Sequence, residues 1–369
     1  MARVVVAMSG GVDSSVTAWL LTRQGHEVIG LFMRHGVDVG ASIPAADTCK
    51  KRTCCSAVDA ADARRVADQI GIPFYAVNFS EQFGQLVDYF VDEYLKGRTP
   101  NPCIRCNSWL KFGELFRYAD SLGADFVATG HYARIVREEG SDRLALLRGV
   151  DPEKDQSYVL FEIDRKRLGR ILLPVGELTK SQVRRIAQEA GLRIARKMDS
   201  QEICFVGERG HGELVRRLRP GRDTSGPIVT LEGTQVGWHS GIEDFTVGQR
   251  KGLGVAFGKR FYVVRIDPDT NTITVGPREA LASFGLIADG ANWLIDPPQE
   301  PFSCQVKIRY RSPAVAATVI PLGETTFQVS FHQACYAVTP GQAAVCYCGD
   351  RVVGGGWIRS LLDNPPKLG

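Results

Sequence analysis

The sequence predicts an α/β protein in which a parallel-sheet domain is followed by a small β-rich domain and an antiparallel β-barrel. Three observations lead to this fold class. A strand runs directly into a Gly/Ser turn and a helix at the N-terminus, strands then alternate with amphipathic helices, and short β-rich runs broken by Gly, Pro and Asp follow. We therefore expect domains at residues 1–210, 211–278 and 279–369.

The N-terminal strand and turn are the most informative stretch. Arg3–Met8 is a short apolar, β-branched run of the kind that forms a buried strand. Ser9–Ser15 follows it, and its two glycines allow a tight turn whose backbone N–H groups face outward. Its last two serines add hydroxyl donors, and the helix behind them supplies a positive dipole end. The stretch predicts an anion site, most naturally for phosphate.

The turn is not a Walker motif, because no Gly-Lys-Ser/Thr sequence closes it and no lysine stands near it in the sequence. Backbone donors with Asp13 beside them suit the pyrophosphate end of a nucleotide that is bound with a divalent cation. ATP with Mg²⁺ is the nucleotide that we expect here.

The elements of the first domain follow from apolar periodicity and caps. In order, we expect a helix over residues 14–24, a strand over 28–33, a loop over 34–55, a helix over 56–70, a strand over 72–79, helices over 81–95 and from 107, a strand over 124–129, and a helix that opens at Thr179 and ends at Gly191. Val58 and Val66 belong to the expected apolar face of the 56–70 helix, and Thr179 with Gln182 has the form of a capping box. Ligands of such a parallel sheet bind at the carboxyl ends of its strands, where Ser9–Ser15 and Gly130–Tyr132 both lie.

The second half of the chain is rich in expected strands. They cover residues 227–231, 261–266, 272–275, 304–310, 314–320, 326–331, 343–347 and 352–358. Lys307, Arg309 and Arg311 alternate along one of these strands and would share a face, which favours RNA binding. A basic cluster between Arg209 and Arg222 fits either a solvated helix face or an RNA contact.

Composition restricts the class of protein. The chain has 369 residues, of which 44% are hydrophobic and 23% charged, as in soluble globular proteins of more than one domain. No apolar run has the length of a membrane span and the N-terminus enters a strand directly, so we expect a cytoplasmic protein without a membrane partner. Ten cysteines without a secretion signal indicate a reducing compartment, with thiols available for chemistry. The net charge of +4 permits an anionic partner without requiring one.

Two cysteines are candidates for that chemistry. Cys106 lies in a Pro-stiffened loop where a helix is expected to begin, so the helix dipole and Arg105 should favour its thiolate. Cys204 lies in a short strand-like run, where an ordinary core position is the alternative interpretation.

Seven motifs occur in order along the chain. They are Ser9–Ser14, Asn101–Asn107, Gly130–Tyr132, Lys154–Tyr158, Ile203–Phe205, Thr246–Gly252 and Ile308–Arg311. With these motifs the chain, from residue 3 to about residue 360, resembles the tRNA-specific 2-thiouridylase (MnmA) family. Ser-Gly-Gly-Val-Asp-Ser is similar to the PP-loop of the ATP pyrophosphatase superfamily, whose sheet domain is of the adenine nucleotide α hydrolase-like type.

The resemblance implies ATP-dependent replacement of the 2-oxygen of the tRNA wobble uridine by sulfur, with release of AMP and pyrophosphate. It implies that Cys106 is the nucleophile, that Cys204 carries a persulfide from a cysteine desulfurase or sulfur-carrier protein, and that Asp13 is catalytic. The two cysteines would form a disulfide during turnover. The implied nucleotide contacts are Ala7, Met8, Ser9, Gly10, Gly11, Val12, Asp13, Ser14, Met33 and Gly130. The implied tRNA contacts are His131, Lys154, Asp155, Gln156, Arg309, Tyr310 and Gln342.

Cys103 is where the sequence departs from many family members, which have Asp at this position. Cys103 is either a redox partner of Cys106, or these two residues and Cys204 are three ligands of an iron–sulfur cluster. The spacing does not separate the two alternatives, and apart from that cluster no metal site is expected. Cys49, Cys54 and Cys55 receive no role.

Two other functions fit part of the sequence. Another PP-loop tRNA-modifying or adenylating enzyme would share Ser9–Ser15 but would not need Cys106 and Cys204. A non-catalytic RNA-binding protein on the same scaffold would keep the basic strand without needing either thiol or Asp13. Pyrophosphate release separates an enzyme from a binding protein, and the sulfur content of the RNA product separates the enzymes.

Overall fold

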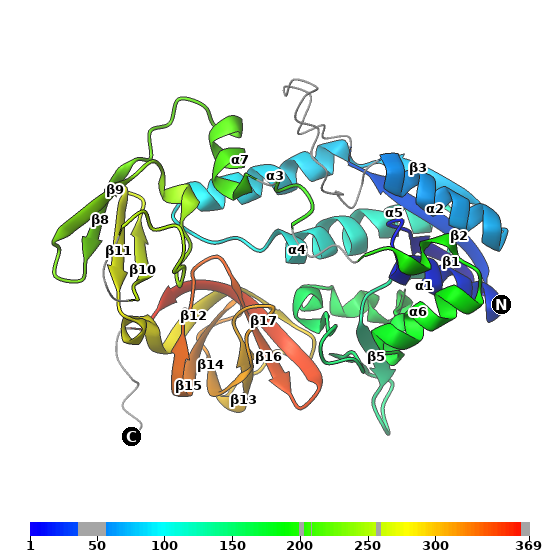
Figure 1. Ribbon diagram of the computed structural model, residues 1–369. Coiled ribbons are helices and arrows are strands. Elements are labelled where there is room, and N and C mark those ends of the chain that lie inside the picture. The colour runs from blue at the N-terminus through cyan, green and yellow to red at the C-terminus, as the bar shows by residue number, and fades with distance from the viewer. Residues whose placement is uncertain (36–56, 199–202, 208, 256–259, 363–369) are drawn as a thin grey trace. The chain divides into compact units, whose positions relative to one another are not determined.

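The computed structural model of the chain describes residues 1–35, 57–198, 203–207, 209–255 and 260–362, and Figure 1 shows its ribbon. The chain divides into two compact units. The first contains Met1–Leu86, Cys103–Phe205 and Asp350–Val353, and the second contains Val87–Pro102, Val206–Gly349 and Gly354–Gly369.

The first unit is built on a five-stranded parallel sheet. Its strands, in spatial order, are β3 (Phe74–Asn78), β2 (Glu27–Arg34), β1 (Arg3–Ala7), β4 (Phe126–Ala128) and β7 (Ile171–Leu172). The strand order reverses direction at β1, because β2 lies on one side of it and β4 on the other. A reversal of this kind opens a crevice at the carboxyl ends of the strands, and ligands of open α/β sheets bind there.

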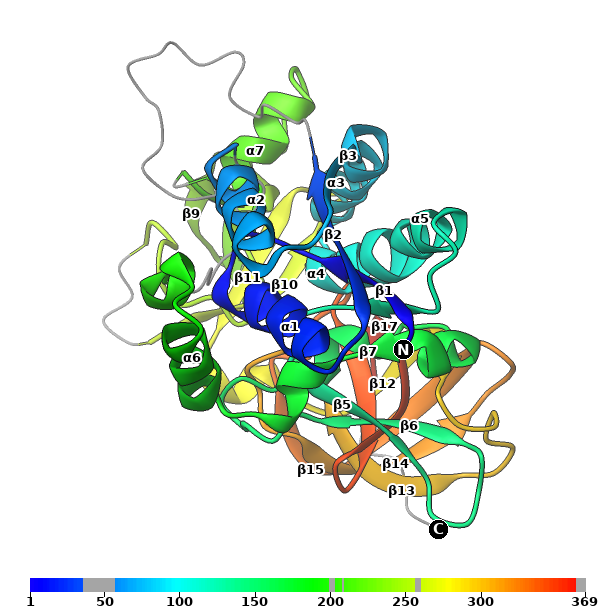
Figure 2. The ribbon, with the colours of Figure 1, turned by 90° about the vertical axis from the view of Figure 1, so that its right-hand side faces the viewer.

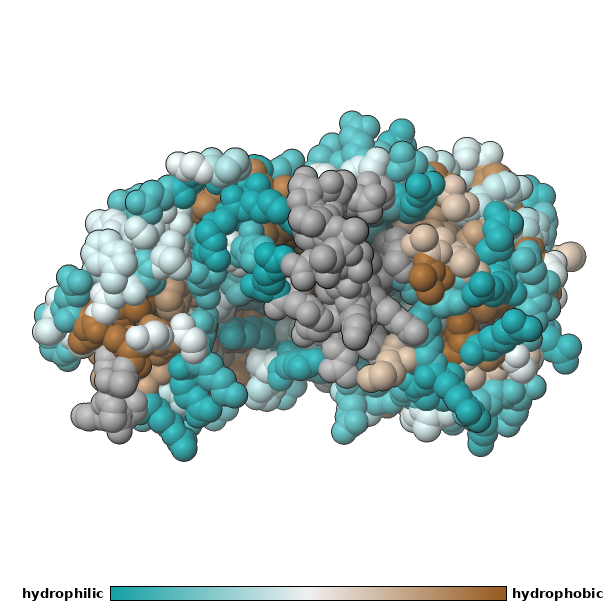
Figure 3. Space-filling view, turned by 45° about the horizontal axis from the view of Figure 1, so that its top comes forward, coloured by the Kyte–Doolittle hydropathy of each residue, from teal (hydrophilic) through white to brown (hydrophobic). Residues whose placement is uncertain are grey.

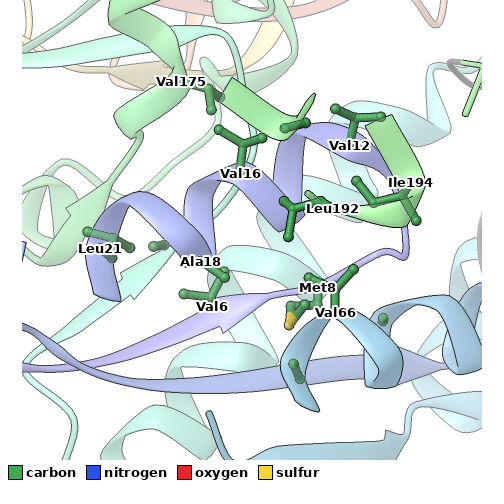
Figure 4. Packing of buried hydrophobic residues seen from close by; sticks show 14 of the residues in the cluster. Val6, Met8, Val12, Val16, Ala18, Leu21, Val66, Val175, Leu192 and Ile194 are labelled. Carbon is green, nitrogen blue, oxygen red and sulfur yellow. The ribbon is translucent and has the colours of Figure 1, made fainter. Parts of the chain in front are cut away.

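Helices cover both faces of this sheet (Figure 2). α1 (Val12–Arg23), α2 (Ala57–Ile70) and α6 (Lys180–Glu189) lie on one face, and α5 (Leu115–Ser121) with the start of α3 (Ser80–Leu95) lies on the other. The core between the sheet and the first three helices is apolar and fully packed. Figure 4 shows this cluster, in which Val6 of β1 and Met8 directly after it meet side chains of α1, α2 and the segment beyond α6. These are Val12 and Val16 of α1, Val66 of α2, and Leu192 and Ile194 beyond α6.

Local signals in the sequence are confirmed where they depend on caps. Gly25 follows the last residues of α1 with a φ of +82°, a conformation that glycine adopts without strain. Thr179 caps α6 by accepting from the Gln182 N–H, while the Gln182 side chain accepts from the Thr179 N–H, so the capping box is complete. Ser56 and the loop cysteines Cys49, Cys54 and Cys55 lie outside the described residues.

Two expectations for the helices are wrong. Val58 is 58% exposed, because α2 buries Asp59, Ala63, Val66 and Ala67 instead. The helix expected from Asn107 begins five residues earlier, as α4 (Pro102–Arg105), and continues without a break as the π-helical segment η2 (Cys106–Glu114). Cys106 therefore lies one turn inside a helical segment and not at its N-terminus, and π-helical turns often occur at functional sites.

Several elements of the first unit have no counterpart in the sequence prediction. β5 (Ala133–Arg137) and β6 (Leu144–Arg148) form an antiparallel hairpin, and β6 also pairs with Arg351 and Val352. Short 3₁₀ turns connect the remaining elements. They are η3 (Ser157–Leu160), η4 (Arg165–Arg170), η5 (Pro174–Glu177) and η6 (Arg193–Arg196).

The second unit contains a closed antiparallel barrel. Its six strands, in spatial order, are β12 (Ala282–Trp293), β15 (Thr326–Tyr336), β14 (Val315–Pro321), β13 (Phe302–Lys307), β16 (Ala343–Cys348) and β17 (Arg351–Leu361), and β12 pairs with β17 to close it. The same unit holds a four-stranded sheet in the order β10 (Tyr262–Asp267), β11 (Thr272–Gly276), β8 (Gly226–Thr230) and β9 (Gln235–His239), preceded by α7 (Gly210–Leu218) and followed by η8 (Arg278–Leu281). The predicted order of a parallel sheet, a small β-rich part and an antiparallel barrel is confirmed.

The basic strand expected around residue 309 is wrong. β13 ends at Lys307, and Arg309 and Arg311 lie in the turn that follows, so the three cations do not share a strand face. The basic cluster is also partly neutralised. Arg216 pairs with Glu243 and Asp244, Arg219 pairs with Asp88 and Asp92, and Arg209 pairs with Glu213.

The surface is mixed in character. On the face drawn in Figure 3, hydrophilic residues cover most of the surface and apolar residues form separate patches. None of the helices in the described part of the chain is both long enough and apolar enough to cross a membrane.

Candidate active site

The predicted phosphate turn has a backbone conformation and a close approach that require glycine at position 10. Gly10 has a φ of +71°, and a Cβ added there would lie 2.3 Å from the carbonyl oxygen of Asp59. Gly11 is the N-cap of α1, so the N-terminus of that helix opens directly onto the turn. Backbone donors and the helix dipole therefore meet at the carboxyl end of β1, as the sequence predicts.

The serine hydroxyls have a different role from the one expected. Ser15 is fully buried and its Oγ donates to the Gly11 carbonyl at 2.8 Å. Ser14 Oγ donates to the same carbonyl at 3.2 Å and accepts from the Ser9 N–H at 3.1 Å. Both hydroxyls stabilise the turn from inside, which leaves the backbone N–H groups as its donors toward a ligand.

Asp13 is held between a lysine and a tyrosine from distant parts of the chain. Lys180 Nζ lies 2.7 and 2.9 Å from the two carboxylate oxygens of Asp13, and the Tyr132 hydroxyl donates to Asp13 Oδ1 at 2.7 Å. Lys180 is the first residue of α6, and its backbone N–H donates to Asp151 Oδ2 at 2.9 Å. The capping box at Thr179 therefore orients this lysine toward the turn.

Gly130 lies against the turn from the neighbouring strand β4. A Cβ at this position would come within 2.6 Å of the Ser14 nitrogen and 2.7 Å of the Asp13 carbonyl carbon, so a side chain does not fit. The remaining predicted nucleotide contacts divide into two groups. The side chains of Ala7, Met8 and Val12 are buried, which leaves their backbones as the possible contacts, and Met33 is half-buried near the end of β2.

Lys197 contacts the turn at Gly10. Its Nζ donates to the Gly10 carbonyl at 2.8 Å and pairs with Asp59 and Asp62, each at 2.7 Å. Burial lowers the pKa of Lys197, but hydrogen bonds and charge attraction from these two aspartates outweigh it, so the pKa lies above its ordinary value. One open depression, lined by Arg65, Gln69 and Arg193 among others, meets this site only through Asp62 and Lys197.

The residues after β4 form a connected polar network. His131 is 7% exposed, with Nδ1 2.7 Å from Thr129 Oγ1 and Nε2 3.5 Å from Lys111 Nζ. Burial and the Lys111 charge hold the pKa of His131 well below its usual range, so the ring is neutral at pH 7. Gln156 Oε1 accepts from the Tyr132 N–H at 3.0 Å and thereby links this network to Asp13.

Two other predicted tRNA contacts flank Gln156. Asp155 is 7% exposed and accepts from the Gly149 and Ser157 backbones, while Lys154 is half-buried. The burial of Asp155 and His131 leaves little of either side chain for RNA in this structure, and their contact with tRNA stays a prediction.

Cys106 is positioned by its neighbours in η2. Asn107 is 3% exposed and its Nδ2 donates to the Val159 carbonyl at 3.0 Å, which fixes η2 against η3. Arg105 forms an ion pair with Glu162, and Ser108 Oγ donates to the same carboxylate at 2.6 Å. The Arg105 charge is therefore paired, and the expected helix start at Cys106 is wrong because the helical segment begins at Pro102. Cys106 is half-buried and Cys103 is exposed.

Cys204 is positioned through the residue that follows it. Phe205 is buried, and its ring meets Phe83 edge-on with centroids 5.5 Å apart. Phe83 in turn stacks on His35, directly after β2, with centroids 4.0 Å apart. Cys204 is half-buried, so it is not a core cysteine, and its neighbour is anchored near the carboxyl end of β2, beside the strand that leads into the phosphate turn.

The predicted tRNA contacts of the second unit have structural partners there. Arg309 Nη2 donates to the Val247 carbonyl at 2.8 Å and to the Thr339 hydroxyl, so this guanidinium braces the barrel turn. Gln342 Nε2 donates to the carbonyls of Thr99 and Pro100 at 3.0 and 3.2 Å. Tyr310 is half-buried beneath Lys307, whose Nζ lies 5.7 Å from the ring centroid.

Metal-ligating side chains do not gather into one group in the described residues. Within those residues, no group of three or more His, Cys, Asp or Glu side chains is arranged to hold a metal ion, and Cys103, Cys106 and Cys204 are all among the residues searched. Iron–sulfur clusters are held by several thiolates at once, and the choice between a thiol relay and a cluster stays a prediction. The barrel cysteines are also not uniform, since Cys335 and Cys346 are buried while Cys348 is exposed.

Sequence reasoning missed Lys180, Lys197 and the role of Tyr132. Lysines 167 and 187 residues from their partners at the turn carry no signal in local spacing. The one available signal for Lys180 was the capping box at Thr179. The capping box marks the start of a helix, and the first residue of such a helix lies near the carboxyl edge of the parallel sheet.

Comparison with known proteins places the chain in a family. The model described as "tRNA methyl transferase HUP domain" matches residues 2–208, which is more than half of the chain. The "tRNA methyl transferase PRC-barrel domain" model matches residues 216–277, and the "Aminomethyltransferase beta-barrel domain" model matches residues 283–358.

Curated relatives match over nearly their whole length. Proteins named tRNA-specific 2-thiouridylase MnmA are 50% identical in Rhodopirellula baltica (99% of this chain and 98% of the relative), 50% in Geotalea uraniireducens (98% and 96%) and 51% in Geobacter metallireducens (98% and 97%). The matched length covers 98–99% of this chain in each case. The chain belongs to the tRNA-specific 2-thiouridylase (MnmA) family.

Proposed function

We propose that this protein replaces the 2-oxygen of the wobble uridine of tRNA by sulfur, at the expense of ATP. The observation that carries the proposal is the turn at the switch point of the sheet, where backbone N–H groups, Asp13 and Lys180 converge. The names of the full-length relatives supply the reaction class. The same substrates, tRNA and ATP, support the cytoplasmic location that the sequence predicts.

ATP binds with its pyrophosphate end at the Gly10–Gly11 turn. Lys180 then exchanges Asp13 for a phosphate oxygen, because both are anionic partners within reach of one flexible ammonium. Asp13, once released, is a carboxylate suited to a Mg²⁺ ion that neutralises the phosphates. Gly130 keeps the neighbouring strand end clear, since any side chain there would collide with Asp13 and Ser14.

The chemistry proceeds by adenylation and displacement. The uridine 2-oxygen attacks the α-phosphorus of ATP and pyrophosphate leaves, which converts a poor leaving group into AMP. Cys204 carries the incoming sulfur as a persulfide. In one route, the terminal sulfur of that persulfide attacks C2 and expels AMP, and the Cys106 thiolate then attacks Cys204 Sγ, which breaks the S–S bond and leaves the sulfur on C2. In the other route, the Cys106 thiolate first attacks Cys204 Sγ and releases sulfide, which attacks C2 and expels AMP. Both routes end with Cys106 and Cys204 joined in a disulfide, which a dithiol reductant must reopen.

tRNA contacts both units in this proposal. His131, Lys154, Asp155 and Gln156 follow the β4 end of the nucleotide site, and Arg309, Tyr310 and Gln342 lie in the second unit. Gln342 supports this role indirectly, because it holds the backbone of Thr99 and Pro100, directly before the Cys103–Cys106 segment in the sequence.

The proposal is tested by incubating tRNA with the protein, ATP and a sulfide source, and then measuring the nucleosides by mass spectrometry. We expect 2-thiouridine in the RNA, and AMP with pyrophosphate in amounts that match it. Pyrophosphate release without sulfur in the RNA would indicate another PP-loop enzyme. RNA binding without pyrophosphate release would indicate a non-catalytic protein.

A further inference from the structure

Lys197 joins three segments that are distant in the sequence. Its ammonium contacts the Gly10 carbonyl, the Asp59 carboxylate and the Asp62 carboxylate, at 2.8, 2.7 and 2.7 Å. The Lys197 side chain is 10% exposed and that of Asp59 is 5% exposed. Three directed bonds account for all three N–H donors of the ammonium. Lys197 is therefore fully occupied in this arrangement, unlike a lysine that waits for phosphate.

The segment carrying Lys197 is itself fixed by core packing. Leu192 and Ile194 are buried, and Figure 4 shows both of them against Val12 at the start of α1. The Lys197 N–H also donates to the Ile194 carbonyl at 2.8 Å. The lysine backbone is thus held by the same core as the helix that follows the phosphate turn.

The contact with the Gly10 carbonyl controls the direction of a particular N–H group. The Gly10 carbonyl and the Gly11 N–H belong to one peptide unit, which is planar and trans, so they point in opposite directions. When Lys197 holds the carbonyl, the Gly11 N–H must point away from Lys197. A cation on the carbonyl also polarises the peptide and makes its N–H a stronger donor.

Helix α2 also approaches the turn closely. A Cβ on Gly10 would lie 2.3 Å from the Asp59 carbonyl oxygen, so the backbone of α2 limits the space around Gly10. Gly10 alone would rotate easily, because a glycine at a positive φ has access to many other conformations. Lys197 and α2 together restrict it to one.

We propose that Lys197 is a positioning residue for the nucleotide phosphates, because it orients and polarises the Gly10–Gly11 peptide so that the Gly11 N–H donates to a β- or γ-phosphate oxygen. The inference rests on the proposed ATP-dependent function and adds a residue that does not touch the substrate. The two aspartates have a second part in it. They neutralise Lys197, so the lysine does not compete with the turn for the phosphates.

Removing Lys197 has two effects that must be separated. It frees the peptide, and it removes the cation that lies between two carboxylates beside a site for anions. We therefore compare Lys197→Met with the triple variant Lys197→Met/Asp59→Asn/Asp62→Asn, which removes both carboxylates as well but still lacks the contact with Gly10. Arg65→Met is the matched control, since Arg65 is an exposed residue that pairs with Asp62 at 3.2 Å.

The measurement is the dissociation constant of the full chain for ATP and for AMP, together with the KM values for ATP and tRNA. We expect Lys197→Met and the triple variant to weaken ATP about tenfold, which is about 1.4 kcal/mol. AMP binding, the KM for tRNA and the Arg65→Met variant should stay at wild-type values, because AMP lacks the two phosphates that the Gly11 N–H would bind.

Two results would overturn the inference. Recovery of wild-type ATP affinity in the triple variant would mean that only charge matters. An equal loss of ATP and AMP affinity would mean that Lys197 merely supports the fold. A thermal melt of each variant measures the loss of stability independently. Failure of the wild-type protein to bind ATP would instead reject the proposed function, so the two failures are distinguishable.

Discussion

Lys180 and Asp13 form a close ion pair across 167 residues of sequence, with the ammonium 2.7 Å from one carboxylate oxygen and 2.9 Å from the other. The pair is largely shielded, since the lysine side chain is 12% exposed and the aspartate 29%. Lys197 contacts the same turn through the Gly10 carbonyl. Two lysines therefore contact the turn although its own sequence contains none.

Because Asp13 pairs with Lys180, replacing Asp13 should lower the stability of the fold as well as the activity. A loop carboxylate alone would add little to stability, but Asp13→Asn leaves a shielded ammonium without its charged partner. We expect turnover to stop and the free energy of unfolding to fall by about 1–3 kcal/mol. AMP production and a denaturant titration measure the two effects. ADP as the main product of the wild-type enzyme would contradict the assignment of the turn.

The capping box should affect catalysis through Lys180. Thr179→Ala removes the acceptor for the Gln182 N–H and should cost about 1 kcal/mol of stability. Because Lys180 is the next residue, we also expect a higher KM for ATP. Gln188→Ala is the control, since Gln188 is an exposed residue of the same helix. Equal KM values for ATP in both variants would show that the helix cap does not affect nucleotide binding.

Cys106 and Cys204, both half-buried, should be required for thiolation and not for folding. We expect Cys106→Ser and Cys204→Ser each to abolish 2-thiouridine while ATP and tRNA still bind. Labelled sulfur from a desulfurase should remain on Cys106→Ser and be missing from Cys204→Ser. Cys348→Ser, which changes an exposed barrel cysteine, should keep full activity. Full activity of Cys204→Ser with the physiological donor would reject the relay.

Cys103 separates the relay from the cluster alternative. A thiol relay should tolerate Cys103→Ser at least partly, because Cys103 is exposed and the relay needs only two thiols. Iron and visible absorption in the purified wild-type protein, both lost in Cys103→Ser, would favour the cluster alternative over the relay.

The barrel arginines should behave differently from each other. Arg309→Ala removes the bonds to Val247 and Thr339, so we expect a loss of about 1–3 kcal/mol in the stability of the second unit. Arg311 is exposed, and Arg311→Ala should leave stability unchanged while lowering the salt slope of tRNA binding by about 1. An unchanged slope would place the RNA away from this turn.

His131 should make the protein sensitive to acid. Its pKa is lowered in the folded state, so below about pH 6.5 the unfolded chain binds a proton that the folded chain does not. Stability should fall as the pH drops below that value, by at most about 1.4 kcal/mol per pH unit. His131→Gln should remove this part of the slope, measured by unfolding at a series of pH values. His332→Gln, at an exposed position, is the control.

Features that depend on neighbouring residues were predictable from the sequence. The apolar run before Ser9 specified a buried strand, Gly10 and Gly11 specified a turn, and Thr179 with Gln182 specified a helix start, because each signal lies within a few residues. The alternation of strands and helices then predicted a parallel sheet, and the motifs predicted the family. The edge of the sheet at which the site lies follows from these.

Only the tertiary structure decided which distant side chains complete the site. Lys180 and Lys197 reach the turn because α6 and η6 pack on α1 through Leu192 and Ile194, and no local pattern encodes that packing. The same limit explains the two wrong expectations with the largest consequences. A strand ends where its pairing with neighbouring strands ends, and β13 therefore stops before Arg309. The start of a helix depends on the residues that pack around it, and Cys106 therefore lies inside a helical segment that begins at Pro102.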